Sequence, residues 1–518
     1  MKLQSFVACA LALLPSLTAA LAELTEFAAD YSYTPATLTA ADVQRQLGPR
    51  LSRQAVIYAQ NDPRFENATM RWQVYNPPSI SVVVQPGIEA DIPHIVRYAN
   101  RKSIPFLTVN TGHGSTISLG KFKGIQIYMN PLNKITISRD KKSALFQGGV
   151  YGQQIISYLW GKGYVAMTGS CGCVGLVGPG LGGGHGRYQG LYGLISDGFI
   201  KLNVVLADGT PIVVSDRSHA DLFWGMKGAG HNFGIVTSVE AKIYPKVIDS
   251  FYAVSYIYTQ DKLEQVFEEL NKLGANGTQP QRLNHYGLYS LAPAISPNQP
   301  VIIMSFDYIG SQAEATPFLT GFENIGAVFK QDGNVPYPQL PHAEGSGVED
   351  APCNKGLTRI QYNANTQMYN VTAQRKVYEL YASKIYQHPG LAETAVVMEG
   401  YATKGVTDKD PKDSAYAIRD EYIMMGINIW YKPNSTLDAF ANDWGKQTAK
   451  LWNEGQPGRK PTTYINYAFG DEPIEQIYGH EPWRLERLRR LKKRYDPKGK
   501  FNYYNPIPLY GRDGIDWN

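Results

Sequence analysis

The feature that most constrains the fold is a run at residues 169–186, half of whose residues are glycine. Such a run is either disordered or it holds its backbone tightly against a ligand. Regular patterns flank it, because a helix is predicted over 151–160 and an ordered segment, Leu191–Leu206, follows. We therefore expect an ordered loop that contacts a ligand.

A second loop, Val109–Thr116, places a histidine between two glycines directly after a predicted strand at 104–110. Glycines let backbone N–H groups approach an anion such as a diphosphate closely, and the neighbouring hydroxyl groups add donors. For this loop alone, a tight turn with an exposed histidine would be the simpler explanation. The residues expected to face a ligand are Thr111, Gly112, His113, Gly114 and Ser115.

Two other interpretations of the glycine-rich run fit its context less well. Gly178–Gly183 matches the dinucleotide fingerprint G-x-G-x-x-G, but that motif requires a helix at the third glycine, and residues 184–186 would break it. Zinc would need Cys171 and Cys173 together with histidines, but a C-x-C pair lacks the usual spacing and no second pair follows. We therefore predict no metal site.

The order of the predicted elements indicates an α+β chain. From residue 79 the pattern runs strand, helix, strand, which implies parallel strands joined by a right-handed crossover. An Asp-Gly pair at 208–209 predicts a hairpin. After Tyr244-Pro245, alternating strands such as Phe251–Tyr258 predict an antiparallel sheet backed by helices, and a strand-like Thr462–Tyr467 and a basic helix follow. The predicted divisions are 1–22, 23–74, 75–245, 246–460 and 461–518.

The first 22 residues predict a secretory signal peptide, because a single lysine precedes an apolar stretch that is too short to span a bilayer. Four N-x-S/T sequons agree with secretion, at Asn67, Asn276, Asn370 and Asn434. Removal of the signal leaves three cysteines, too few for a disulfide framework, so at least one should have another role. A net charge of only +5 indicates neither a nucleic-acid nor a membrane partner.

Several motifs in order resemble the berberine bridge enzyme-like flavoproteins, a branch of the vanillyl-alcohol oxidase, or PCMH-type FAD-binding, superfamily. They are the His113 loop, the C-x-x-V-G run from Cys171, Leu181-Gly-Gly-Gly184, Asp221-Leu-Phe-Trp224 and Phe233-Gly-Ile-Val236. The resemblance covers about 65 to 245 and resumes at Tyr464-Ile-Asn466-Tyr467 and Tyr495-Asp-Pro497. It implies a two-part PCMH-type FAD-binding domain, a substrate domain, and a C-terminal segment that returns to the FAD domain.

In that family the flavin is often attached twice, which here implies His113 and Cys171. The motifs depart from the family in two places, because a glycine follows His113 and Cys-Gly-Cys replaces Cys-Pro-Thr, so Cys173 could compete for the flavin or pair with Cys171. Attachment needs a neutral imidazole and a thiolate, and we expect the loop dipoles to lower the thiol pKa. The further FAD contacts that the resemblance implies are Val174, Gly175, Gly178, Gly182, Gly183, Gly184, Ile235, Val236 and Asn466.

The resemblance also implies a catalytic base, Tyr467, the second tyrosine of Y-x-N-Y. A tyrosine with an ordinary pKa near 10 must be tuned by neighbours or relay a proton to act near neutral pH. Without the resemblance, Tyr464 and Tyr467 would be explained as core residues of a strand. The predicted strand at 424–431 would line the substrate side through Asn428, with Tyr464 as a second contact. Some family members carry a carboxylate near that asparagine, and its absence would leave no second base on the strand.

These expectations describe a secreted, monomeric FAD-dependent oxidoreductase acting on a small molecule. In the family, a valine three residues after the attachment cysteine favours reaction with O2, so Val174 implies an oxidase. One candidate substrate is a secondary metabolite whose alcohol is oxidised or whose ring is closed, and the alternative is a carbohydrate oxidised to its lactone. A third hypothesis, of another class, is a flavin-free binding protein on the same scaffold.

Overall fold

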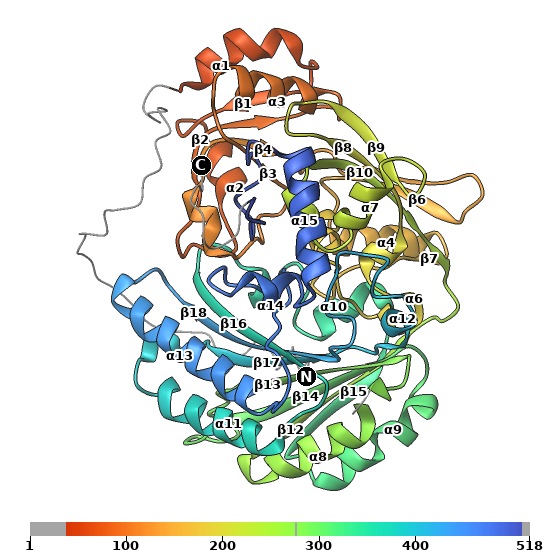
Figure 1. Ribbon diagram of the computed structural model, residues 1–518. Helices are drawn as coiled ribbons and strands as arrows, with labels where there is room; N and C mark the ends of the chain where they lie inside the picture. The colour runs from red at the N-terminus through yellow and green to blue at the C-terminus, as the bar shows by residue number, and fades with distance from the viewer. Residues whose placement is uncertain (1–37, 275–276, 510–518) are drawn as a thin grey trace.

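The chain folds into two halves that lie one above the other in Figure 1. The computed structural model describes residues 38–274 and 277–509. The expected signal peptide and the sequon at Asn276 lie outside these ranges. Among the residues described, no helix is long and apolar enough to cross a membrane.

The first half contains three sheets, the smallest of which pairs β7 (Tyr164–Val165) with β11 (Tyr244–Pro245). In the four-stranded sheet, of order β1-β2-β4-β3, β4 pairs in parallel with both β2 and β3, so it lies between the two strands of the predicted strand-helix-strand unit. In the five-stranded antiparallel sheet, of order β5-β6-β10-β8-β9, β8 and β9 form the hairpin expected at 208–209. The strands are β1 (Val56–Tyr58), β2 (Ser79–Gln85), β3 (Phe106–Val109), β4 (Lys123–Tyr128), β5 (Ile135–Ile137), β6 (Ser143–Gln147), β8 (Phe199–Val205), β9 (Pro211–Ser215) and β10 (Ile235–Lys242).

Helices of the first half cover these sheets with their apolar faces. In α3 (Asp91–Arg101), Ile92, Ile95 and Ala99 recur at helical spacing, and all three are buried in the core of the four-stranded sheet. The other helices are α1 (Ala40–Leu47), α2 (Arg64–Thr69), α4 (Gly152–Gly161), α5 (Val177–Leu181), α6 (Gln189–Tyr192) and α7 (Ala220–Met226).

The second half is a seven-stranded antiparallel sheet of order β15-β12-β14-β13-β17-β18-β16. Helices cover its lower face in Figure 1, and its upper face is turned towards the first half. The strands are β12 (Phe251–Tyr258), β13 (Leu283–Ser290), β14 (Val301–Tyr308), β15 (Phe329–Val335), β16 (Thr358–Thr366), β17 (Ala395–Gly400) and β18 (Ile423–Tyr431), and the covering helices are α8 (Leu263–Gly274), α9 (Gln312–Ile325), α11 (Val371–Ile385) and α13 (Ser435–Glu454).

The C-terminal segment packs on the first half through α15 (Pro482–Tyr495), whose Leu485, Leu488 and Leu491 belong to the same apolar core as α7. The strand expected at Thr462–Tyr467 is wrong, because this stretch forms a turn in which the amide of Tyr467 donates to the carbonyl of Tyr464 at 2.8 Å. In a strand, residues three apart would point to opposite faces. The turn instead brings the rings of Tyr464 and Tyr467 to a centroid distance of 5.0 Å.

Candidate active site

A cavity of about 660 Å³ lies between the two halves and is lined by both. Loops of the first half, mainly 108–115 and 169–181, form one wall, which we call the loop side. Side chains of β13, β16, β17 and β18 form the opposite wall, which we call the sheet side. The cavity therefore joins the two glycine-rich segments of the sequence to the large antiparallel sheet.

The loop side presents free backbone donors and open space. Gly112 has a φ of 79°, and the amides of Gly112 to Ser115 donate to no other described residue. A side chain added at Gly169 or Gly178, which both line the cavity, would meet no atom within 4 Å of its Cβ. The wall can thus accept a large ligand with an anionic part.

His113 lines the cavity with a neutral imidazole. Its Nδ1 lies 2.9 Å from the hydroxyl oxygen of Thr111, and that oxygen also accepts a hydrogen bond from the amide of Gly175 at 3.2 Å, so Thr111 connects the two loops. Burial lowers the pKa of His113 to about 3, and the nearby charges of Lys355 and Arg359 act in the same direction. The neutral form is the one with a nucleophilic ring nitrogen.

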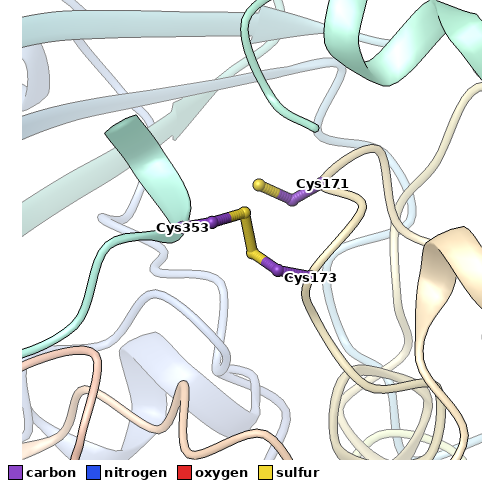
Figure 2. Close-up of side chains that lie close together, drawn as sticks. All are labelled: Cys171, Cys173 and Cys353. Carbon is purple, nitrogen blue, oxygen red and sulfur yellow. A yellow bond between two sulfur atoms is a disulfide. The ribbon is translucent and has the colours of Figure 1, made fainter. Parts of the chain in front are cut away.

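Cys171 is the free thiol of the described residues and lines the cavity, whereas Cys173 forms a disulfide with Cys353 (Figure 2). The pairing of Cys173 with Cys171 that the spacing allowed is not what the structure contains. Burial raises the pKa of the Cys171 thiol to about 11, and the charge of Arg187 opposes this shift only in part. The expectation of a lowered thiol pKa was therefore wrong, because the loss of solvent outweighs the loop dipoles.

The other expected FAD contacts divide into two groups. Six of them line the cavity: Val174, Gly175, Gly178, Ile235, Val236 and Asn466. Gly182, Gly183 and Gly184 do not, and they are packing positions instead. A Cβ on Gly182 would lie 2.4 Å from the side-chain oxygen of Asn466, and the amide of Gly184 donates to the Tyr464 hydroxyl at 3.2 Å, so these glycines let the Y-x-N-Y turn approach the loop.

Tyr467 and Glu399 form a pair on the sheet side. The Tyr467 hydroxyl donates to both carboxylate oxygens of Glu399, at 3.0 and 3.1 Å. Burial raises the pKa of Glu399 above its usual value, and hydrogen bonds from Tyr467 and Tyr401 oppose this shift. Burial and the neighbouring carboxylate raise the pKa of Tyr467 well above 10. Tyr467 alone is therefore a poor base, and the pair can pass a proton through the hydroxyl to the carboxylate.

Sequence reasoning missed Glu399, although a signal was present. Along β17, Ala395, Val397 and Glu399 alternate with buried residues and line the cavity. A carboxylate in an otherwise apolar strand is costly to bury and marks a functional position. The strand of Asn428 has no such carboxylate, as expected, but the neighbouring strand β17 supplies one in Glu399.

Asn428 and Tyr464, the predicted substrate contacts, also line the cavity. Asn428 lies on β18 opposite Gln361 of β16, and its buried side-chain oxygen has no hydrogen-bond partner among the described residues. The Tyr464 hydroxyl instead accepts a hydrogen bond from the side chain of Asn466 at 2.6 Å. Asn428 is therefore the better placed of the two for a ligand hydroxyl.

Arg187 ties the cysteine loop to the second half. Its guanidinium is buried, donates to the carbonyl of Ser170 at 2.7 Å, and forms ion pairs with Asp307 of β14 and with Glu344. The hydroxyl of Ser170 lies 2.8 Å from that of Tyr401. Ser170, the residue before Cys171, is thus held through both its carbonyl and its hydroxyl group.

Comparisons with known proteins agree with this site. A family model described as "FAD binding domain" matches residues 80–215, and one described as "Berberine and berberine like" matches residues 463–508. The FAD-linked oxidoreductase anuG of Penicillium roqueforti is 53% identical over 475 residues, which cover 92% of this chain and 93% of that protein.

Solved structures show the same fold. Physcomitrella patens BBE-like 1 matches with a TM-score of 0.78 at 18% identity, over 92% of this chain and 100% of that chain. Glucooligosaccharide oxidase from Acremonium strictum, described with a 6-S-cysteinyl, 8α-N1-histidyl FAD, matches with a TM-score of 0.76 at 16% identity, over 90% of this chain and 99% of that chain.

These findings define an FAD-dependent oxidoreductase. More narrowly, the chain belongs to the berberine bridge enzyme-like FAD-linked oxidoreductases, as its motifs predicted. The predicted α+β fold with a large antiparallel sheet is confirmed as well.

The loop side fits FAD. The free amides from Gly112 to Ser115 suit a diphosphate, and the open space at Gly169 and Gly178 leaves room for the cofactor. The neutral imidazole and the free thiol line the same wall.

Proposed function

We propose that this protein is a secreted oxidase that carries FAD covalently on His113 and Cys171 and oxidises a small molecule. The observation that carries the proposal is that both attachment candidates and the Tyr467–Glu399 pair line one cavity. The FAD-binding domain would comprise 75–245 together with the C-terminal segment from 461, and 246–460 would hold the substrate.

His113 and Cys171 supply the two attachment atoms. Each attachment would form one bond between the ring nitrogen or sulfur and the flavin, with two protons released and two electrons passed to dioxygen. The neighbour from Acremonium strictum, described with a cysteinyl and histidyl FAD, supports this assignment. Thr111 would orient the imidazole through its contact with Nδ1.

Tyr467 and Glu399 would remove the proton from the substrate. FAD, when bound, accepts the hydride from a substrate C–H bond. The Tyr467 hydroxyl takes the proton of the adjacent substrate hydroxyl and passes its own proton to Glu399, which must therefore be ionised at the start. Since its pKa is raised, activity should be lost as the pH falls through a value above the ordinary 4.5 of this carboxyl.

The substrate we favour is an apolar metabolite with an oxidisable alcohol. Apolar and aromatic side chains form much of the cavity wall, among them Trp72, Leu288, Val397 and Trp430. A flat, apolar molecule would bury its surface against these groups. This composition supports a role in the tailoring of secondary metabolites, by alcohol oxidation or by ring closure.

A carbohydrate oxidase is the second candidate. Gln361, Glu393 and Asn428 also line the cavity and could bond sugar hydroxyls. Hydrogen peroxide release should therefore be screened with cello-oligosaccharides and with hydroxylated aromatic compounds. Peroxide with the sugars alone would contradict the preferred substrate class. Reduction of the flavin without peroxide would contradict the oxidase assignment, which Val174 at the cavity supports.

Secretion would expose the sequons to glycosylation. Asn67, Asn370 and Asn434 are all exposed, but the side-chain nitrogen of Asn370 donates to the carbonyl of Gly455 at 2.9 Å. We expect Asn67 and Asn434 to be the better acceptors, which mass measurement before and after enzymatic deglycosylation would check.

Precipitation of the purified protein with acid tests the central proposal. Yellow colour that stays in the pellet indicates covalent FAD. A colourless native protein would instead favour the flavin-free binding protein on this scaffold.

A further inference from the structure

Three sulfur atoms lie together at the cavity wall. Those of Cys171, Cys173 and Cys353 are all within 4.8 Å of one another (Figure 2). Sulfur atoms this close can exchange disulfide partners, yet the bond joins Cys173 to Cys353. Cys171 lines the cavity and the other two cysteines are not among its lining residues. The observed pairing therefore leaves the free thiol on the cysteine that lines the cavity.

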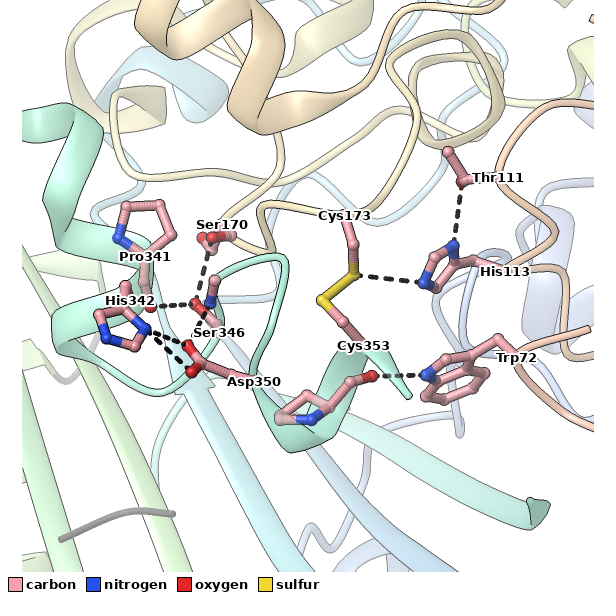
Figure 3. Close-up of a disulfide and its surroundings, with 12 residues drawn as sticks. Trp72, Thr111, His113, Ser170, Cys173, Pro341, His342, Ser346, Asp350 and Cys353 are labelled. Carbon is pink, nitrogen blue, oxygen red and sulfur yellow. Dashed lines mark hydrogen bonds and ion pairs between the residues drawn. A yellow bond between two sulfur atoms is a disulfide. The ribbon is translucent and has the colours of Figure 1, made fainter. Parts of the chain in front are cut away.

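The disulfide also changes the chemistry of His113. The Nε2 of its ring lies 3.3 Å from the sulfur of Cys173 (Figure 3). A free thiol at this distance would donate a hydrogen bond to Nε2 and would not protonate it, because burial lowers the pKa of His113 to about 3. That hydrogen bond would occupy the lone pair of Nε2, and the thiol of Cys173 would be a second nucleophile beside Cys171. A disulfide sulfur has no proton to give.

The segment that carries Cys353 is held to the first half by other contacts too. This segment, residues 336–357, connects β15 to β16, and we call it the strap. The amide of Gly172 donates to the carbonyl of Ser346 at 2.8 Å, and the indole of Trp72 donates to that of Pro352 at 2.6 Å (Figure 3). The strap should therefore keep its place when the disulfide is removed.

We propose that the Cys173–Cys353 disulfide directs flavin attachment, since it reserves Cys171 as the reacting thiol and removes a competing thiol from the Nε2 of His113. The inference rests on the proposed covalent FAD. The disulfide forms before attachment. Its formation releases two protons and passes two electrons from the cysteine pair to an oxidised thiol compound such as glutathione disulfide.

Peptide mapping of three proteins tests the proposal: the wild type, Cys353→Ser, and the double variant Cys173→Ser/Cys353→Ser. In the wild type, the flavin should be found on the peptides of Cys171 and His113. Cys353→Ser leaves two neighbouring thiols, so flavin on Cys171 should fall about tenfold in favour of flavin on Cys173 or of a Cys171–Cys173 disulfide. The double variant has no competing thiol and should regain wild-type attachment at Cys171.

Both variants lack the covalent link to the strap, but only Cys353→Ser keeps a competing thiol at Cys173. A difference between them therefore reports the competing thiol and not the loss of the link. The proposal fails if Cys353→Ser loads Cys171 as fully as the wild type, or if the double variant loads it no better than the single one. A wild type without covalent flavin would instead overturn the proposed function.

A second measurement applies if Cys353→Ser does not fold. Wild-type apoprotein is alkylated without reduction, and the labelled peptides are identified. Among the three cysteines, only Cys171 should be labelled. Label on Cys173 or Cys353 would overturn the proposal.

Discussion

The two walls of the cavity are built in different ways. The loop side binds through backbone, with amides from Gly112 to Ser115 free and open space at Gly169 and Gly178. The sheet side works through side chains such as Glu399 and Asn428, which stand on separate strands. We infer that the loop side holds the cofactor, while the side chains of the sheet side bind the substrate and take part in the reaction.

Because the cofactor is assigned to the loop side, single changes on the sheet side should affect turnover and leave flavin content unchanged. Glu399→Gln removes the proton acceptor of the Tyr467–Glu399 pair, and turnover should fall about 10²–10⁴-fold. Stopped-flow measurement of flavin reduction would give the rate, and absorbance would give the flavin content.

Glu323→Gln is the matched control, because Glu323 accepts a hydrogen bond from Tyr256 at 2.8 Å in a pair that does not line the cavity. Its turnover should be unchanged. Loss of flavin in Glu399→Gln would mean that the two walls do not act separately.

On the loop side, attachment at Cys171 should depend strongly on pH. With a thiol pKa of about 11, the thiolate is about 10⁻⁴ of the total at pH 7 and rises tenfold for each pH unit. The rate of attachment to apoprotein should therefore increase about 100-fold between pH 7 and 9. His113, with its pKa lowered to about 3, stays neutral throughout.

Attachment is followed as acid-stable flavin over time. In Cys171→Ser, only the histidine link remains, and its rate should be nearly constant over this range. A constant rate in the wild type would show that another group takes the thiol proton in the assembled site.

Filling the loop side should lower flavin content rather than turnover per bound flavin. Gly178→Leu places a side chain in the open space of that wall, and a cost of about 1–3 kcal/mol corresponds to roughly 5- to 150-fold in affinity. The ratio of flavin to protein absorbance would measure the effect.

Gly161→Leu is its control, because Gly161 also has no atom within 4 Å of an added Cβ but does not line the cavity. Equal loss of flavin in both variants would contradict the assignment of this wall to the cofactor.

The smallest expected effect concerns the surroundings of Glu399. Tyr401→Phe removes a hydroxyl that lowers the pKa of Glu399, so that pKa should rise further. The loss of one hydrogen bond, about 1 kcal/mol, should slow turnover about fivefold and move the acidic limit of activity to higher pH. Tyr378→Phe, which loses a hydrogen bond to the carbonyl of Pro300 outside the cavity, should leave the pH profile unchanged.

The difference between the two walls also explains which parts of the site could be predicted from the sequence. A loop that binds through backbone needs glycines at fixed positions, so His113, Cys171 and their neighbours were visible as local patterns. The pair on the sheet side depends on strand register and on a distant turn, since Glu399 and Tyr467 lie 68 residues apart. Likewise the partner of Cys173 is 180 residues away, and nothing in the C-x-C motif indicates it.

The turn at Tyr467 is a second feature that the local sequence pattern does not predict. The sequence at Thr462–Tyr467 predicts a strand, but the backbone forms a turn that brings the two tyrosine rings together. The motif itself, compared with its family, was more informative about the cavity than the local pattern.

The C-terminal segment bears on the order of events during synthesis. Its last described part supplies Lys500, Phe501, Tyr503 and Tyr504 to the loop side, and its first part supplies Tyr467 to the sheet side. Both walls therefore stay incomplete until this segment has left the ribosome. FAD can be enclosed only after translation of this segment, and a transcript cut short before residue 500 would yield a protein with an open cofactor site.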